Sequence, residues 1–376
     1  MKRVTLLLLF LLAAVAVTAQ DAKRLTILHT NDFHSHLQGF APESAYTPMA
    51  ADNDPTRGGL ARIAGMIKAV REENPGSTMV VDAGDCLMGT LFQALEPATG
   101  FQIPLMKKAG YDVVALGNHD FDFGPEAYAG IIKKSTQNGE IPVMLLGNVV
   151  TDPEDPADDS FEAVLKEGLV RPWVIKEVNG IRVGLFSLLG KDADESAPYA
   201  PPVTFGKIIP AAKKLVKVLE KEGSDVIICL SHSGIVKDKK GGWTGEDVKL
   251  ARKVKGIDMI ITGHTHTLLK EPLLVNGVPI VGVGDNGRYL GRIDLQIGSG
   301  GMKIEKYEAI PVDDSAPARE DIQSEIILQQ EVINEAILSP LGMTYTMPVV
   351  SAPFTVSYDE DRKSTRLNSS HGKLTR

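Results

Sequence analysis

Short apolar runs rich in Val and Ile alternate along this chain with stretches whose apolar residues recur at helical spacing. The helical spacing is clearest in residues 60–70 and 212–219, where apolar side chains fall three and four positions apart. The apolar runs predict strands at Leu25–His29, Met79–Val81, Val113–Leu116, Val143–Leu146, Ile181–Leu188, Val226–Leu230, Met259–Ile261, Pro279–Val283 and Leu290–Ile297.

Runs as apolar as these indicate strands that are buried on both faces, which requires sheets covered by helices. The pattern therefore predicts an α/β fold. Within it, acidic residues and two Pro in Thr151–Ser160 predict a surface loop rather than a domain boundary.

The composition changes near residue 311. A linker over residues 311–317 is followed by Glu320–Leu338, whose apolar stripe predicts a helix. We expect one domain over residues 20–312, a linker and helix over 313–342, and the start of a truncated second domain over 343–360. Without the rest of that second domain, the helix should be poorly docked.

Residues 361–376 replace acidic and apolar sequence with a basic, Ser-rich run that has no periodicity. This run resembles the in-frame translation of a common sequencing-library adapter. We interpret it as an artefact rather than as a disordered basic tail, and expect the natural sequence to diverge at or just before Asp361.

The N-terminus carries the pattern of a secretory signal peptide. Lys2 and Arg3 precede an apolar run over residues 6–17, which is shorter than the roughly 20 residues that cross a membrane. Small residues follow, so we expect cleavage after Ala19 and a secreted or periplasmic protein without stable membrane insertion. The alternative is an uncleaved membrane anchor.

Charge and cysteine content narrow the classes of function. The chain has 40 Lys and Arg against 48 Asp and Glu, a net charge of −8, which disfavours binding to a nucleic-acid polymer. Two Cys residues cannot form a Cys-rich zinc site. Cys86 and Cys229 adjoin two of the motifs described next, and the sequence leaves open whether they pair or stay free.

Polar residues that can bind metals follow five of the predicted strands. Ligand sites in open α/β sheets form beyond the carboxyl ends of strands, so this placement predicts one site. Imidazole, carboxylate and amide donors without a thiolate suit Zn, Mn, Fe or Co, and the Asp85 carboxylate could bridge two such ions. The motifs are Asp32-x-His34, Gly84-Asp85, Gly117-Asn118-His119-Asp120-Phe121-Asp122, His232 and Gly263-His264-Thr265-His266.

In this order, the motifs resemble the pattern of the calcineurin-like metallophosphoesterases. The opening segment Ile27–His34 and the closing segment Gly287–Leu295 are similar to the secreted 5′-nucleotidase branch of that family. The branch includes UDP-sugar hydrolases and 2′,3′-cyclic-nucleotide phosphodiesterases. The resemblance covers about residues 24–310 and implies a four-layer metallophosphatase sandwich, with two mixed β-sheets flanked by helices.

The resemblance also implies a role for each residue. His119 becomes the catalytic imidazole with Asp122 as its orienting partner, whereas Asp120 is structural. His36 either supports the ligands or belongs to plain loop structure, and His29 is interpreted as a core residue. Two divalent metal ions are expected, one held by Asp32, His34, Asp85 and His266, and the other by Asp85, Asn118, His232 and His264.

The implied activity is hydrolysis of phosphate esters by a metal-activated hydroxide, with no Ser, Thr or Cys nucleophile. The expected substrate is a nucleotide, hydrolysed as by a 5′-nucleotidase, or a related small phosphate ester. Alternatives on the same site are a 2′,3′-cyclic-nucleotide phosphodiesterase, a UDP-sugar pyrophosphatase and a sulfur-transferring relative. A non-catalytic exported binding protein is a further alternative, which the full ligand set disfavours. In this family a C-terminal domain supplies nucleoside recognition, and we expect that domain to be missing here.

Overall fold

Two mixed β-sheets packed face to face form the centre of the fold, in a computed structural model that describes residues 22–41, 45–50 and 54–348. The first sheet consists of β1 (Lys23–Thr30), β2 (Thr78–Asp82), β3 (Val113–Ala115), β4 (Val143–Leu145), β6 (Val170–Arg171), β16 (Tyr289–Gly298) and β17 (Gly301–Pro311). Its strand order is β17-β16-β1-β2-β3-β4-β6, with β16 and β17 antiparallel to their neighbours. The remaining five strands are parallel.

The second sheet has a parallel centre and two antiparallel edges. It consists of β7 (Trp173–Val178), β8 (Ile181–Leu189), β10 (Val226–His232), β13 (Met259–Thr262), β14 (Leu273–Val275) and β15 (Val278–Val281). The strand order is β14-β15-β13-β10-β8-β7, and only the β14 and β7 pairings are antiparallel.

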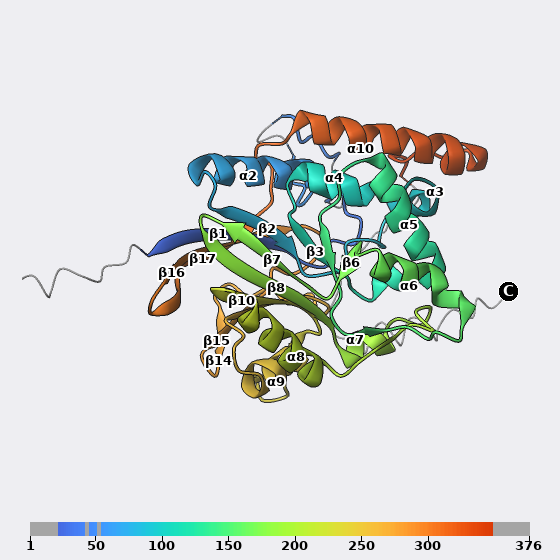
Figure 1. The fold of residues 1–376 in the computed structure, drawn as a ribbon. Helices are drawn as coiled ribbons and strands as arrows, with labels where there is room; N and C mark the ends of the chain where they lie inside the picture. Colours follow the sequence, from blue (N-terminus) through green and yellow to red (C-terminus); the bar gives the residue numbers. More distant parts are fainter. Residues whose placement is uncertain (1–21, 42–44, 51–53, 349–376) are drawn as a thin grey trace, which may run out of the picture. The chain divides into compact units, whose positions relative to one another are not determined.

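Helices cover the outer faces of both sheets. α2 (Leu60–Glu73), α4 (Gln102–Ala109) and α10 (Glu320–Ile333) lie over the first sheet, and α8 (Ile208–Lys221) and α9 (Glu246–Lys253) lie over the second (Figure 1). Between the sheets, apolar side chains of both inner faces form one core, which includes Ile27 and Val81 from the first sheet and Leu185 and Ile228 from the second. The expected four-layer sandwich is confirmed.

The strand predictions succeeded in the interior of the sheets and missed the edges. All nine predicted strands are present, and they are the interior strands β1 to β4 and β16 of the first sheet and β8, β10, β13 and β15 of the second. The edge strands β6, β7, β14 and β17 were not predicted. The same holds for the short pairs of β5 (Val149–Val150) with β9 (Thr204–Phe205) and of β11 (Ile235–Lys237) with β12 (Trp243–Gly245).

The segment Thr151–Ser160 is a loop only in its first half. A 3₁₀ turn forms at Pro156–Asp158, where the Asp155 carboxylate accepts a hydrogen bond from the Ala157 amide at 3.0 Å. The helix α6 (Asp159–Lys166) then begins, with Phe161 and Val164 buried. The Pro and Asp residues that suggested a loop are therefore the start signals of a helix.

The predicted C-terminal helix is α10, and it is well docked, contrary to expectation. Ile322, Ile326 and Ile333 are fully buried, and α10 belongs to the same compact unit as the sheets. That unit ends at Ile333 rather than at residue 312. The second unit starts with a π-helical turn, Asn334–Leu338, followed by a 3₁₀ turn at Ser339–Leu341, and residues 343–348 form no strand.

Three predictions fall outside the described residues. These are the signal peptide over residues 1–19, most of the second-domain segment 343–360, and the basic run 361–376. Across residues 22–41, 45–50 and 54–348, no helix is both long enough and apolar enough to span a bilayer.

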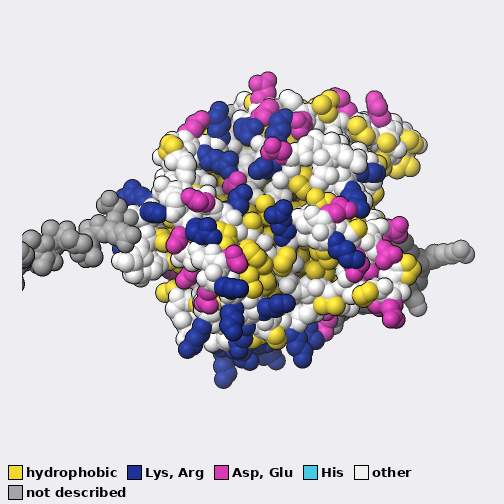
Figure 2. Space-filling view, in the orientation of Figure 1, with side chains coloured by type: hydrophobic (Ala, Val, Ile, Leu, Met, Phe, Trp, Pro, Cys, Tyr) yellow, Lys and Arg dark blue, Asp and Glu magenta, His cyan; other side chains and the backbone are white. Residues whose placement is uncertain are grey.

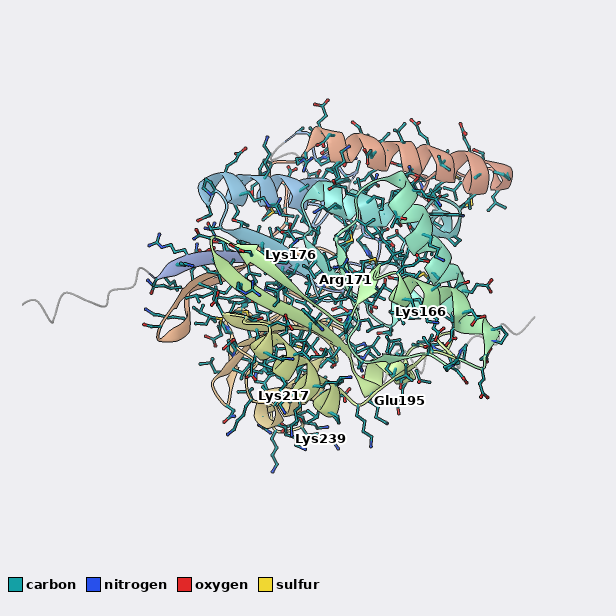
Figure 3. All side chains as sticks on the ribbon, in the orientation of Figure 1. Lys166, Arg171, Lys176, Glu195, Lys217 and Lys239 are labelled. Atoms are coloured by element: carbon teal, nitrogen blue, oxygen red, sulfur yellow. The ribbon has the colours of Figure 1, made fainter. Side chains whose placement is uncertain are left out.

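The surface charges are unevenly distributed. In Figure 2, Lys and Arg side chains gather over α8 and α9, and no His side chain is visible on this face. The exposed lysines of α8 are Lys213, Lys214, Lys217 and Lys221. Lys217 and Lys239 lie at the periphery, away from the sheets (Figure 3).

A buried arginine joins the start of α2 to two distant acidic segments. The Arg62 side chain is fully buried, and its Nη2 lies 2.6 Å from Asp314 Oδ1 and 3.1 Å from Asp54 Oδ2. Nη1 donates to Thr56 Oγ1 at 2.9 Å, and the guanidinium group lies 4.9 Å from the centre of the Tyr46 ring. The two carboxylates are largely shielded from water and share the Arg62 guanidinium as a counter-charge, while Asp54 also accepts hydrogen bonds from Thr47 and Thr56.

Replacing Arg62 by Met should lower the free energy of unfolding by about 3–5 kcal/mol, because two buried carboxylates lose their counter-charge. Chemical denaturation measures this loss. Lys68→Met on the same helix is the matched control, because the Lys68–Glu72 pair is exposed and its removal should change little. Equal effects of the two substitutions would contradict the structural role of Arg62.

His29 lies in the interior of the fold, as its interpretation as a core residue predicts. It is fully buried in β1, its ring stacks on Tyr307 with centroids 6.4 Å apart, and neither ring nitrogen has a hydrogen-bond partner. Burial lowers the pKa of His29 to about 3. The folded protein therefore holds this imidazole in its neutral form.

This depressed pKa predicts a pH-dependent loss of stability. The unfolded chain protonates His29 near pH 6.5, whereas the folded chain does not until about pH 3. The stabilisation is present above pH 6.5 and is lost as the pH falls, approaching about 1.4 kcal/mol per pH unit. Denaturation at several pH values should show this slope in the wild type relative to His29→Leu. Parallel pH dependences of the two proteins would contradict a neutral His29.

Candidate metal centre

Five loops from both sheets meet at one end of the sandwich. They follow β1, β2 and β3 of the first sheet and β10 and β13 of the second. Because these strands run parallel within each sheet, their carboxyl ends lie at the same edge. The backbone amide of His264 donates to Asp32 Oδ1 at 2.9 Å, although the two residues are 232 positions apart. The fold therefore brings together the motifs that the sequence separates.

The backbone is strained at the residues that carry the donor atoms. Five of the seven predicted ligands have a left-handed φ between 50° and 72°, a conformation that non-glycine residues rarely adopt. Such residues cluster at functional sites, where the surrounding structure holds them in place. The five are Asp32, His34, Asp85, His264 and His266.

Two glycines of the motifs are required by close packing. A Cβ atom on Gly117 would lie 2.1 Å from Asp85 Oδ1, and one on Gly84 would lie 2.7 Å from His232 Nδ1. Any side chain at either position would displace a donor group. The glycines that precede Asp85 and Asn118 therefore let the loops approach one another closely.

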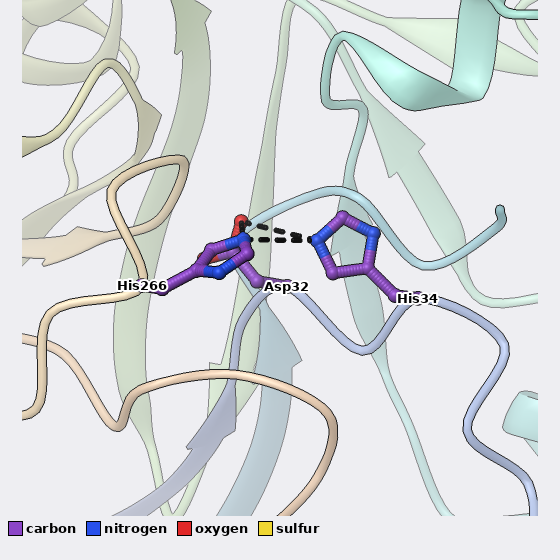
Figure 4. Close-up of side chains that lie close together, drawn as sticks. All are labelled: Asp32, His34 and His266. Atoms are coloured by element: carbon purple, nitrogen blue, oxygen red, sulfur yellow. Dashed lines mark hydrogen bonds and ion pairs between the residues drawn. The ribbon is translucent and has the colours of Figure 1, made fainter. Parts of the chain in front are cut away.

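The first group of donor atoms combines β1 and β13 loop residues. His34 Nε2 lies 3.1 Å from His266 Nε2 and 3.9 Å from Asp32 Oδ1, and His266 Nε2 lies 3.6 Å from the same carboxylate oxygen (Figure 4). Together the three residues form a compact group able to hold a metal ion.

The second group of donor atoms lies on the other side of Asp85. His232 Nε2 is 3.1 Å from Asp85 Oδ2 and 3.2 Å from Asn118 Oδ1, and His264 Nδ1 is 3.0 Å from the same amide oxygen. Asp85 Oδ2 is also 4.0 Å from His34 Nε2, so it links the two groups. The structure thus brings all seven predicted ligands into one connected cluster.

The carboxylates of the cluster favour positive charge. Burial opposes protonation of His232, but the adjacent Asp85 outweighs it and raises the pKa of His232 to about 10. At His34 and His264, by contrast, burial prevails and lowers the pKa of each imidazole. The interior of the cluster is therefore a region in which a cation is stabilised.

Each of the four imidazoles is held through the nitrogen that faces away from the cluster. Backbone carbonyl oxygens accept from two rings, with Met88 O 3.0 Å from His34 Nδ1 and Ala83 O 3.0 Å from His232 Nδ1. The carboxylates of Asp192 and Asp285 face the outer nitrogens of the other two rings, those of His264 and His266. The outer nitrogen of each ring thus has an acceptor for its N–H, and the inner nitrogen can bind a cation when it carries no proton. Of these partners, the sequence predicted none.

The two carboxylates belong to Asp192 and Asp285. Asp192 Oδ2 lies 3.0 Å from His264 Nε2, and Asp285 Oδ2 lies 3.4 Å from His266 Nδ1. Both could have been found from the sequence, because Asp192 follows the predicted strand Ile181–Leu188 and Asp285 follows Pro279–Val283. They were missed because no histidine or motif glycine accompanies Asp192, and because Asp285 lies just before the closing segment Gly287–Leu295 and was not counted among the motifs.

His119 and Asp122 form the predicted pair. His119 Nδ1 lies 2.7 Å from Asp122 Oδ2, and this hydrogen bond raises the pKa of His119 to about 9. The side chain of His119 is 42% exposed and its ring meets the ring of His34 edge-on at 5.3 Å. It therefore lies beside the cluster with its Nε2 available to a bound molecule.

Asp120 is fully buried and connects two motif loops. Its carboxylate accepts hydrogen bonds from the amides of Gly117 and Leu87, at 2.8 and 3.4 Å. The Cys86 thiol donates to the same carboxylate at 3.5 Å. Both cysteines are free and buried, so the alternative of a Cys86–Cys229 disulfide is excluded.

Three histidines, His29, His36 and His371, belong neither to the predicted ligands nor to the His119–Asp122 pair. His36 Nδ1 donates to the carbonyl oxygen of His34 at 2.8 Å, so it supports the loop that carries a ligand. His29 lies in the core, and His371 lies outside the described residues.

Comparison with known proteins identifies the family to which this fold and site belong. The model of the calcineurin-like phosphoesterases matches residues 25–268. The chain belongs to this family, whose members use divalent metals.

Similar proteins include a probable 5′-nucleotidase of Treponema pallidum, 34% identical over 69% of this chain and 39% of the relative. The crystal structure of a 5′-nucleotidase precursor from Thermus thermophilus is 26% identical, with a TM-score of 0.68 over 83% of this chain and 59% of the other. That of the calcineurin-like phosphoesterase YfkN from Bacillus subtilis is 25% identical, with a TM-score of 0.64 over 84% of this chain and 99% of the other. The chain spans about half the length, or less, of the first curated relatives that it matches.

Proposed function

We propose that this protein is an exported hydrolase of nucleotides that uses two divalent metal ions, acting as a 5′-nucleotidase. The proposal combines the family with the donor cluster and with the curated relatives named as 5′-nucleotidases. The comparisons support the reaction class, and the cluster supports the number of ions.

One observation carries the metal proposal. His34 Nε2 and His266 Nε2 lie 3.1 Å apart, while the opposite nitrogen of each ring already faces a hydrogen-bond acceptor. Two lone pairs at this distance repel each other unless a cation, either a proton or a metal ion, lies near both. Two imidazoles with a carboxylate form a donor set suited to Zn, Mn, Fe or Co.

We assign one ion to Asp32, His34, Asp85 and His266, and the other to Asp85, Asn118, His232 and His264. Asp32 and Asp85 both lie between the two groups, so either carboxylate could bridge them. Both oxygens of Asp32 already accept hydrogen bonds, from the His264 amide and from Asn31 Nδ2. Asp85 uses only Oδ1 for a backbone amide, that of His119. Asp85 Oδ2 is therefore the better bridge.

The chain's own residues supply proton transfer and orientation. When bound, the ions lower the pKa of a coordinated water and offset the negative charge of the phosphoryl oxygens. Asp122 holds His119 through Nδ1, which leaves Nε2–H directed at the reacting group. From this atom His119 can donate a hydrogen bond to the charge that develops on the phosphate, or a proton to the leaving oxygen.

A second candidate activity is supported by one relative. The YfkN protein of Bacillus subtilis is named a trifunctional nucleotide phosphoesterase, and it is 26% identical over 80% of this chain. The same donor cluster could therefore act on 2′,3′-cyclic nucleotides or on UDP-sugars. Rates on AMP, 2′,3′-cyclic AMP and UDP-glucose compared under one metal condition distinguish the three activities.

Export is also part of the proposal. A mature protein that begins at Gln20, read by intact mass, is the expected result of signal cleavage after Ala19.

Replacing Asp85 by Asn should remove metal and activity together, because the amide has neither the charge nor the second anionic oxygen of a bridge. Metal content by mass spectrometry and the rate on a generic phosphate ester are measured on the same samples. Asp159→Asn, at an exposed position in α6, is the control and should retain two ions. Full activity in Asp85→Asn, or in chelator-treated wild type, would refute the two-ion proposal.

Replacing His119 by Ala should leave both ions bound and lower kcat by roughly 10²–10⁴-fold, the usual scale of acid–base or electrostatic assistance. Asp122→Asn should cause a smaller loss of the same kind, because the imidazole remains but loses its charged partner. Metal analysis alongside kinetics separates the roles: loss of an ion in His119→Ala would show that the imidazole is a ligand instead.

A further inference from the structure

The short helix α7 (Lys191–Glu195) contacts the donor cluster, although it lies outside the five motif loops. Its residue Asp192 places Oδ2 3.0 Å from His264 Nε2, on the side of the ring opposite to Asn118 Oδ1. Both oxygens can only accept, and a neutral ring has one N–H, which the charged carboxylate attracts more strongly than the amide oxygen does, so the N–H lies on Nε2. The lone pair of His264 Nδ1 is thereby directed into the cluster.

α7 is itself held in a defined position. Glu246 Oε2 accepts from the backbone amides of Lys191 and Asp192 at its N-terminus, at 2.6 and 3.3 Å. Immediately before the helix, the amide of Gly190 donates to the carbonyl of His232 at 3.0 Å. The backbone that carries Asp192 is therefore anchored to the second sheet.

The segment around α7 contacts Asn118, His232 and His264, the three residues that we assign to one ion and not to the other. Beyond the contacts to His232 and His264, the Ser196 carbonyl oxygen lies 3.5 Å from Asn118 Nδ2. This contact orients the amide so that its oxygen faces both imidazoles. One short segment thus contacts all three residues, the His264 ring and the Asn118 amide through their side chains and His232 through its backbone.

Asp285 occupies the corresponding position in the other half. Its Oδ2 lies 3.4 Å from His266 Nδ1, and Arg288 pairs with its other oxygen. Asp285 is buried, whereas the side chain of Asp192 is 50% exposed. Water screens the charge of Asp192 more strongly, so its effect on a bound ion should be the smaller of the two.

We propose that Asp192 is a positioning residue for the ion held by Asn118, His232 and His264, and that Asp285 is the positioning residue for the other ion. The inference rests on the proposed two-ion function. Each carboxylate fixes the tautomer and orientation of one imidazole and increases the basicity of its inner nitrogen. In each half of the cluster, a different carboxylate therefore adjusts the affinity for the bound ion.

The test is titration of the metal-free full chain with Co²⁺, followed by calorimetry and by the visible absorption of the bound ion. Wild type should bind two ions. Asp192→Ala should weaken one of them by about 10-fold and change its absorption, while the affinity and absorption of the other stay as in wild type. Asp285→Ala should weaken the opposite ion, by up to about 100-fold.

Two further variants separate positioning from general stability. Glu195→Ala, an exposed position on the same helix, should bind both ions as wild type does. Asp192→Glu, which keeps the carboxylate, should recover part of the lost affinity.

Three outcomes would overturn the inference. If wild type binds two ions and Asp192→Ala binds both of them as wild type does, this inference is refuted while the proposed function stands. Loss of both ions together with a lower melting temperature would show that Asp192 is a structural residue. A wild type that binds fewer than two ions would remove the proposed function and, with it, this inference.

Discussion

The two sheets must bury their inner faces against each other, and the rest of the structure depends on this constraint. Side chains such as Ile27 and Leu230 fill the space between the sheets, and the pairing fixes how the strands of one sheet lie against those of the other. Because the central strands of each sheet are parallel, their carboxyl ends open onto the same edge. Two sets of loops from distant parts of the chain are therefore forced to share one small space, and the donor cluster occupies it.

Sharing that space has an energetic cost that the surrounding structure offsets. Left-handed backbone at a non-glycine residue costs on the order of 1–3 kcal/mol, and five ligand candidates adopt it. The loops compensate by bonding to one another: the Asp32 amide donates to Gly84 O and the His34 amide to Asp85 O, both at 2.9 Å. The donor atoms are thus held close together by backbone hydrogen bonds and the core, and a cation completes an arrangement that the chain already forms.

The hydrophobic pattern predicted the interior of both sheets and failed at their edges for a physical reason. Interior strands such as β8 are buried on both faces and read as continuous apolar runs. The edge strand β17 has one face in solvent, and a register shift at Asp294–Leu295 in its partner β16 disturbs its alternation. Helix docking was mispredicted because the partner of α10 was sought in a second domain, whereas Ile322 and Ile326 are buried within the first unit.

The contrast between unusual and ordinary sequence patterns also explains which residues of the site the sequence reveals. Histidines and glycines in fixed order are rare, so Gly263-His264-Thr265-His266 stands out from its surroundings. Asp192 and the carbonyl of Met88 contact His264 and His34 directly, but a surface aspartate and a backbone carbonyl occur everywhere in a chain. A sequence therefore reveals chemistry that needs unusual residues sooner than it reveals specificity, which needs only common ones in the right place.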